Sequence, residues 1–138
     1  MTERQYLPTL AELIDRLSIV QLKEIYIPEH AAEYKAEREL IAHDIDLFLE
    51  AVPTHLGAKE VRAILMIMLS NRVIWENESI ARQGGDAQDG RLKYTHSING
   101  VRNRAKNVIA AFEQGRKDYK TDALAANLPP EFGNWDVI

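Results

Sequence analysis

The stretch TLAELIDRLSIVQLKE, residues 9–24, decides the fold because it predicts a helix with two apolar sides. One side carries Leu10, Leu13, Leu17 and Val20 at helical spacing. The side opposite Leu17 carries Ile19 and Leu22, with Asp15 between them. Such a helix is either sandwiched within the fold or shared with a partner subunit. Because an isolated buried carboxylate is costly, we expect Asp15 to have a cationic or amide partner, and a structural salt bridge to Arg102 is the simplest arrangement.

Helical periodicity on both sides of this stretch predicts four helices in all. The first begins at a capping box formed by Thr9 and Glu12, and Pro28 limits it near Tyr26. The second spans roughly 29–51, and its apolar stripe comprises Ala31, Tyr34, Leu40, Ile41, Ile45 and Phe48. The third, roughly 58–82, is apolar on all sides across AILMIML, residues 63–69, which predicts a central buried helix. The fourth, roughly 91–115, has a core stripe of Ile98, Val101, Ala105, Val108 and Phe112.

Four helices with short connections predict an all-α fold, an antiparallel four-helix bundle with an extended C-terminal tail. The bundle domain spans residues 1–120 and the tail residues 121–138. Pro129 and Pro130 stop any helix in the tail. Its last apolar side chains are costly to leave in water, so we expect the tail to dock on the bundle or on a neighbouring subunit.

Composition limits the class of protein. The chain of 138 residues suits one domain and has no cysteine, which excludes disulfides and thiolate metal sites. The N-terminus lacks the apolar core of a signal peptide, and no apolar run is long enough to cross a bilayer. We therefore expect a cytoplasmic protein with no membrane partner. The net charge of −4 makes duplex nucleic acid a minor alternative among partners.

Charge is distributed unevenly within that total. Residues 24–50 carry eight acids against two bases, whereas residues 90–112 carry five bases and no acid. Opposite charges on the two segments could help them to pack together. They could equally leave one basic surface for an anionic ligand.

The fourth helix contains HSINGVRNRAKN, residues 96–107, which predicts a binding face. The polar residues His96, Asn99, Arg102, Asn103 and Lys106 fall together beside the core stripe. Solvated helix faces usually mix Glu with Lys and avoid Asn, because Asn competes for backbone hydrogen bonds. For each residue alone, a solvated surface remains the simpler interpretation. For the group, a face of amides and bases favours an anion.

Further candidates lie on the first, third and fourth helices. Arg16 and Lys23, two turns apart, would neutralise phosphate together with Arg102 and Lys106. Hydrogen bonds to the ligand would come from Asn71, His96, Asn99 and Asn103. Trp75 or Tyr94 would stack on a base. The structural alternative is that Trp75 fills the core and Asn71 bonds to a neighbouring helix.

The chemistry of an enzyme is not evident in the sequence. The four histidines are scattered without metal-ligand spacing, so we expect no metal site, no cofactor and no catalytic residue. An all-α, magnesium-dependent nucleotide pyrophosphatase is the enzymatic alternative, because Glu33 and Glu37 could face Glu76 and Glu78. The ExxE and ExxD spacings typical of that class are missing.

Residues 9–24 and LKYTHSINGVRNRAKNVI, residues 92–109, with NRVIW at 71–75 between them, resemble a family of small helical proteins from bacteria and their phages. The resemblance carries no catalytic assignment. By analogy of size and class, it implies an anti-defence protein that sequesters a signalling nucleotide.

Three hypotheses follow for the function. The first is non-catalytic binding of a small anionic ligand such as a nucleotide by a homo-oligomer. The second is the pyrophosphatase, and the third is a protein-interaction factor without ligand.

Overall fold

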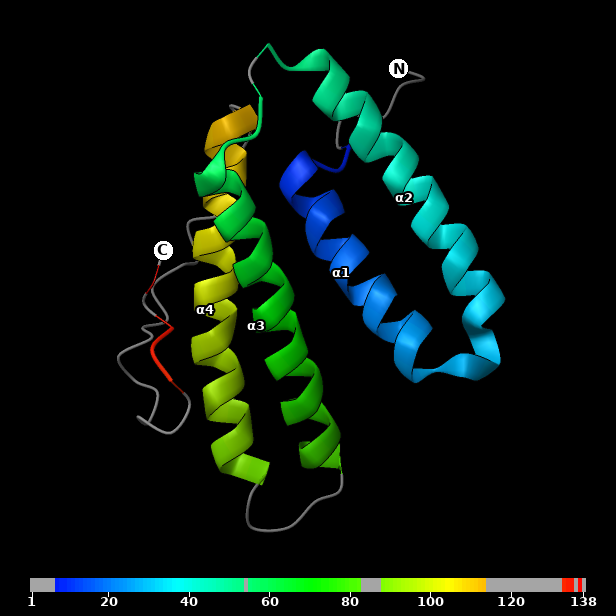
Figure 1. Ribbon diagram of the computed structural model, residues 1–138. Helices are drawn as coiled ribbons and strands as arrows, with labels where there is room; N and C mark the ends of the chain where they lie inside the picture. Colours follow the sequence, from blue (N-terminus) through cyan, green and yellow to red (C-terminus); the bar gives the residue numbers. More distant parts are fainter. Residues whose placement is uncertain (1–6, 54, 83–87, 114–132, 136, 138) are drawn as a thin grey trace, which may run out of the picture.

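The computed structural model describes residues 7–53, 55–82, 88–113, 133–135 and 137, and this part of the chain is all-helical, without strands (Figure 1). The predicted all-α class is therefore confirmed. The helices are α1 (Leu10–Tyr26), α2 (Ala31–Ala51), α3 (Ala58–Arg82) and α4 (Gln88–Glu113). A 3-10 turn at Pro28–His30 joins α1 to α2.

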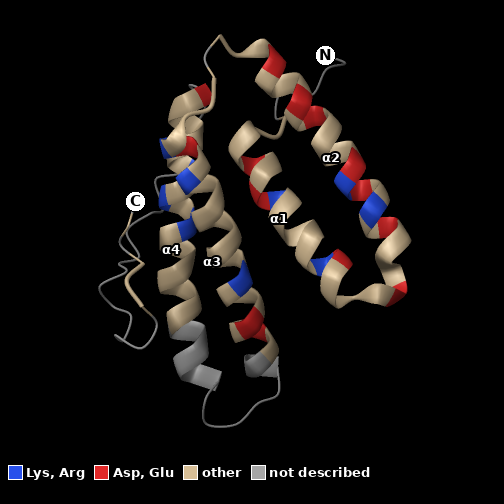
Figure 2. Ribbon diagram, viewed as in Figure 1, with Lys and Arg blue, Asp and Glu red and all other residues tan. Residues whose placement is uncertain are grey.

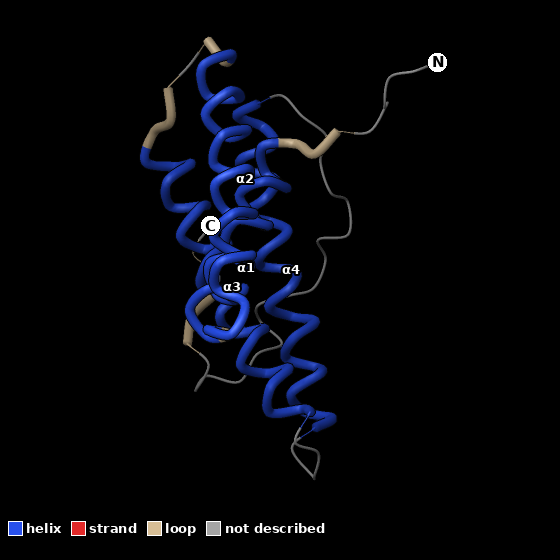
Figure 3. Tube along the Cα trace, turned by 90° about the vertical axis from the view of Figure 1, so that its right-hand side faces the viewer, coloured by secondary structure: helices blue, strands red, loops and turns tan. Residues whose placement is uncertain are grey.

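Helix α1 lies in the middle of the molecule. It packs against α2 on one side and against α3 and α4 on the other, while α3 and α4 lie side by side along much of their length (Figures 1 and 3). Helix α1 is therefore covered from two directions within the chain, as the sandwiched alternative predicted. The sides differ from the predicted ones, because Leu10 packs towards α3 and α4 whereas Leu13 and Val20 pack towards α2. Leu10, Leu13, Val20 and Leu22 are each at most 5% exposed.

The core divides according to these two sides of α1. The larger cluster joins α1 to α3 and α4 and comprises Leu10, Ala11, Ile14, Ala63, Met66, Ile67, Val101, Ala105 and Ile109. The smaller cluster joins α1 to α2 through Leu13, Val20 and Ile41. A bidentate contact of Arg38 with Glu24, at 2.7 and 3.1 Å, also connects α2 to α1.

Two sets of hydrogen bonds stabilise the N-terminus of α1, one local and one from α4. Thr9 and Glu12 form the predicted capping box. In addition, the carboxylate of Glu113, at the end of α4, accepts the backbone N–H groups of Leu10 and Ala11 at 3.0 and 3.3 Å. A carboxylate at a helix N-terminus accepts hydrogen bonds from the free backbone N–H groups. Its negative charge also interacts favourably with the positive end of the helix dipole. The two ends of the described helical segment are thereby joined.

The expectation that α3 is buried on all sides is wrong. Its inner face is buried through Ala63, Met66 and Ile67, but Val61, Leu65 and Leu69 are 47%, 57% and 52% exposed. Because α2 packs on the far side of α1, it does not cover α3. The apolar run AILMIML thus forms one buried face and one exposed apolar row, which consists of Val61, Leu65 and Leu69.

The predicted stripe of α2 is also wrong in part, because Leu40 is 71% exposed and Ile41 is the buried position of the helix.

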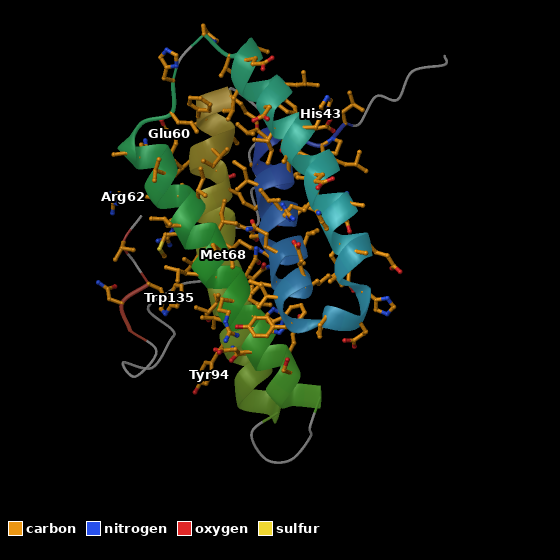
Figure 4. All side chains as sticks on the ribbon, turned by 45° about the vertical axis from the view of Figure 1, so that its right-hand side comes forward. His43, Glu60, Arg62, Met68, Tyr94 and Trp135 are labelled. Carbon is orange, nitrogen blue, oxygen red and sulfur yellow. The ribbon has the colours of Figure 1, made fainter. Side chains whose placement is uncertain are left out.

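The chain end shows two contacts. Trp135 packs against the larger core cluster, and the Arg62 guanidinium donates to the Val137 carbonyl at 2.6 Å. In Figure 4, His43 marks α2, and Trp135 lies on the opposite side of α3. The expected tail contacts of residues 121–132 lie outside the described residues.

Within the described ranges, no helix is both long and apolar enough to cross a membrane.

Candidate functional site

A polar network joins α1, α3 and α4 around the carboxylate of Asp15. The side-chain amide of Asn71 donates to Asp15 Oδ1 at 2.7 Å and to Ser18 Oγ at 2.6 Å. The Ser18 hydroxyl donates in turn to the backbone carbonyl of Asp15 at 2.7 Å. Asn71 is 3% exposed, so its contacts are made inside the protein. The expected amide partner of Asp15 is therefore confirmed.

Helix α4 supplies the cations of this network. Arg102 donates to Asn71 Oδ1 at 2.8 Å and also to the side-chain carbonyl of Asn99. Its guanidinium lies 4.0 Å from Asp15 Oδ1, and Lys106 Nζ lies 3.6 Å from Asp15 Oδ2. The anticipated Asp15–Arg102 pair is present, but Asn71 and Lys106 make the shorter contacts with the carboxylate.

The network explains why amides and bases occur within α4. The side chains of Asp15, Lys106 and Arg102 are only 15%, 19% and 21% exposed. Partly buried ions need both opposite charge and hydrogen bonds, and the network supplies both. The anion that Arg102 and Lys106 face is the protein's own carboxylate. Asn71, Asn99, Arg102 and Lys106, which the sequence suggested as contacts of a ligand, thus gather around an internal counter-ion.

A groove of about 420 Å³ lies between α1 and α2. Its volume falls within the range of small-molecule sites in proteins. It contains the two remaining predicted bases, Arg16 and Lys23, but no other predicted ligand-binding residue. Its lining comprises Pro8, Glu12, Leu13, Asp15, Arg16, Ile19, Val20, Lys23 and Glu37.

The groove contains three carboxylates, two of which already have partners. Glu12 closes the capping box on Thr9, and Asp15 belongs to the polar network. Among the described residues, neither Arg16 nor Glu37 makes an ion pair, and the Lys23 ammonium lies 5.9 Å from the centre of the Tyr34 ring. Among the described residues, two positive charges on α1 and one negative charge on α2 therefore line the groove without an ion-pair partner.

The aromatic candidates lie elsewhere. The ring of Trp75 lies 6.1 Å from that of Tyr26, and the Arg72 guanidinium lies 4.9 Å above Tyr26. Trp75 is half-buried and belongs to neither core cluster, so the core-filling alternative does not describe it. Tyr94 is half-buried on the N-terminal half of α4 (Figure 4).

The last two candidates on α4 differ in burial. His96 is exposed, whereas Asn103 is 7% exposed. Neither residue lines the groove.

The acids of the pyrophosphatase alternative do not converge. Glu33 on α2 is 77% exposed and lies near His30, whereas Glu76 on α3 pairs with Arg72 at 2.9 Å. In the described ranges, no group of three His, Cys, Asp or Glu residues could hold a metal ion. Figure 2 shows acids along α2 and bases on the C-terminal half of α4, with the central part of α3 largely free of charge.

Sequence reasoning named Glu37 for the pyrophosphatase alternative alone, outside the ligand-binding residues, and did not name Ser18. Glu37 stands one turn after Tyr34 in the predicted apolar stripe, which places it at the edge facing α1. That position could have indicated that Glu37 lies near α1. Ser18 follows Asp15 by three residues, and only the tertiary contact with Asn71 shows its role.

The comparisons with known proteins give no relative. No protein-family model matches the chain, and neither the curated proteins nor the solved structures contain a significant match.

Proposed function

We propose that the protein binds a small anionic ligand, such as a signalling nucleotide, in the groove between α1 and α2 without transforming it. The observation that carries this proposal is the position of Arg16 and Lys23 in one groove whose acidic neighbours Glu12 and Asp15 are already engaged. Both bases extend from the same helix, seven residues apart, and long side chains allow both to reach one phosphate.

The polar network around Asp15 serves this site indirectly. Lys106 offsets the charge of the Asp15 carboxylate and Asn71 donates a hydrogen bond to it, so that this groove residue repels an anion less. The network also holds α1 in one register on α3 and α4. Arg102, Asn99 and Asn71 therefore support the groove wall in this proposal, while Arg16 and Lys23 touch the ligand.

The helices form an antiparallel four-helix bundle in which α2 is the outer helix, and the protein acts in the cytoplasm. Sequestration of a signalling nucleotide by a phage-encoded protein is the biological role that suits binding without turnover.

Calorimetric titration with 5′-nucleoside monophosphates and cyclic dinucleotides tests the proposal. Wild-type protein should bind at least one probe, and mass spectrometry should recover it unchanged with or without Mg²⁺. Arg16→Met and Lys23→Met should each weaken binding roughly tenfold or more, because each removes a charge-assisted contact. Lys59→Met on exposed α3 surface removes the same charge and should have no effect. Equal loss in all three variants would refute the groove as the site.

A second function, protein interaction, is favoured by the exposed apolar row on α3. Val61, Leu65 and Leu69 lie four residues apart and are about half exposed. A helix face of this kind suits another helix, and we propose that it supports a homo-oligomer. Light scattering of the purified protein over a concentration series tests this, because a monomeric mass at all concentrations would exclude self-association.

A further inference from the structure

Glu37 is the one uncommitted acid in a groove that otherwise suits an anion. It comes from α2 and lines the groove together with two bases of α1. Among the described residues it makes no ion pair, although Arg16 and Lys23 line the same groove. A carboxylate in this place would repel a ligand that is anionic throughout. It would instead stabilise a ligand with a hydrogen-bond-donating group at its other end.

Pro8 and Ile19 supply the accessible apolar surface of the groove, since Pro8 is exposed and Ile19 is half-buried. Leu13 and Val20, which are 5% and 2% exposed, belong to the core between α1 and α2. Apolar side chains at this place suit one face of a flat ring. The groove thus offers bases for a phosphate, an apolar contact for a ring, and one carboxylate for the edge of that ring.

From this arrangement we infer that Glu37 reads the base of a nucleotide and selects guanine. This inference rests on the proposed binding of a phosphate-bearing ligand in the groove. Guanine presents two adjacent donors, N1–H and the 2-amino group, which match the two oxygens of a carboxylate. Adenine has one amino group beside an acceptor nitrogen, which faces a carboxylate unfavourably. Hypoxanthine keeps N1–H but lacks the 2-amino group.

Titration of GMP, IMP and AMP into the full chain tests the inference. Wild-type protein should bind GMP roughly tenfold more tightly than IMP, because one charge-assisted hydrogen bond distinguishes the two. Glu37→Gln should abolish that preference, because it weakens GMP binding through two hydrogen bonds and IMP binding through one. The matched control is Glu33→Gln, one turn earlier on α2, at an exposed position outside the groove lining, and it should retain the preference. Circular dichroism of each variant checks that α2 remains helical.

The outcomes separate the two proposals. Equal affinity for GMP and IMP in the wild type, both weakened by Arg16→Met, would overturn the role of Glu37 and leave phosphate binding in the groove intact. A GMP preference that persists in Glu37→Gln would also overturn it. If none of the three nucleotides binds, the inference and nucleotide binding in this groove both fail.

Discussion

Removal of the charge on Asp15 should destabilise the protein more than any other single conservative change in the polar network. In Asp15→Asn the side chain keeps its shape, but the partly buried Lys106 and Arg102 lose their counter-ion. Breaking a fully buried pair costs about 3–5 kcal/mol, and hydrogen bonds to charged groups contribute about 1.5–3 kcal/mol. Because these side chains remain 15–21% exposed, we expect a loss of about 2–3 kcal/mol.

Thermal and urea denaturation measure this loss. A change of that size should lower the Tm of a chain of 138 residues by roughly 10 °C. The matched control is Asp44→Asn on α2, where the carboxylate is 59% exposed and contacts His43 alone among the described residues. The control should cost less than about 0.5 kcal/mol. Similar losses in both variants would refute the interpretation that Asp15 is the central counter-ion of the network.

A double-mutant cycle isolates the ionic contribution. Lys106→Met alone should destabilise the protein, but adding it to Asp15→Asn should cost less than the sum of the two single changes. We expect a coupling free energy of roughly 1 kcal/mol for groups 3.6 Å apart and largely buried. Strict additivity would show that Lys106 and Asp15 do not stabilise one another.

Three further changes test separate parts of the structure. Glu113→Gln should cost about 1 kcal/mol of unfolding free energy in urea, because its charge no longer supports the N-terminus of α1; an unchanged urea midpoint would contradict this. Thr9→Ala should cost about 1 kcal/mol in the same assay by removing the capping box, whereas Thr9→Ser should be nearly neutral. Leu65→Asp combined with Leu69→Asp should preserve the fold and reduce the mass found by light scattering to that of a monomer; an unaltered oligomer would exclude this row as the interface.

The helices could be predicted, and a sandwiched α1 could be named as one of two alternatives, because both depend on local patterns. The capping box at Thr9 sets the start of α1, and apolar residues on two sides require neighbours on both sides. The chemical type of the partner of Asp15 could be predicted, because a carboxylate between Ile19 and Leu22 needs a cationic or amide hydrogen-bond donor. Its principal partners, Asn71 and Lys106, depend on which helices meet, and periodicity does not specify this.

The burial of α3 was predicted wrongly for a related reason. A run of apolar residues indicates burial on every side only when helices are available to cover every side. Here α2 packs on α1, which leaves Leu65 and Leu69 half exposed. The separation of the candidate bases has the same origin: Arg16 and Lys23 line the groove with Glu37 of α2, whereas Arg102 and Lys106 lie near Asp15.

A two-dimensional ¹H–¹⁵N NMR titration with GMP tests the central claim, which is that the anion site lies between α1 and α2. The account predicts saturable shifts of the Arg16, Lys23 and Glu37 amides, with much smaller shifts at Arg102 and Lys106 on α4. Saturable shifts centred on Arg102 and Lys106 would place the anion in the polar network. Either that result or a spectrum unaltered at millimolar GMP would contradict the account.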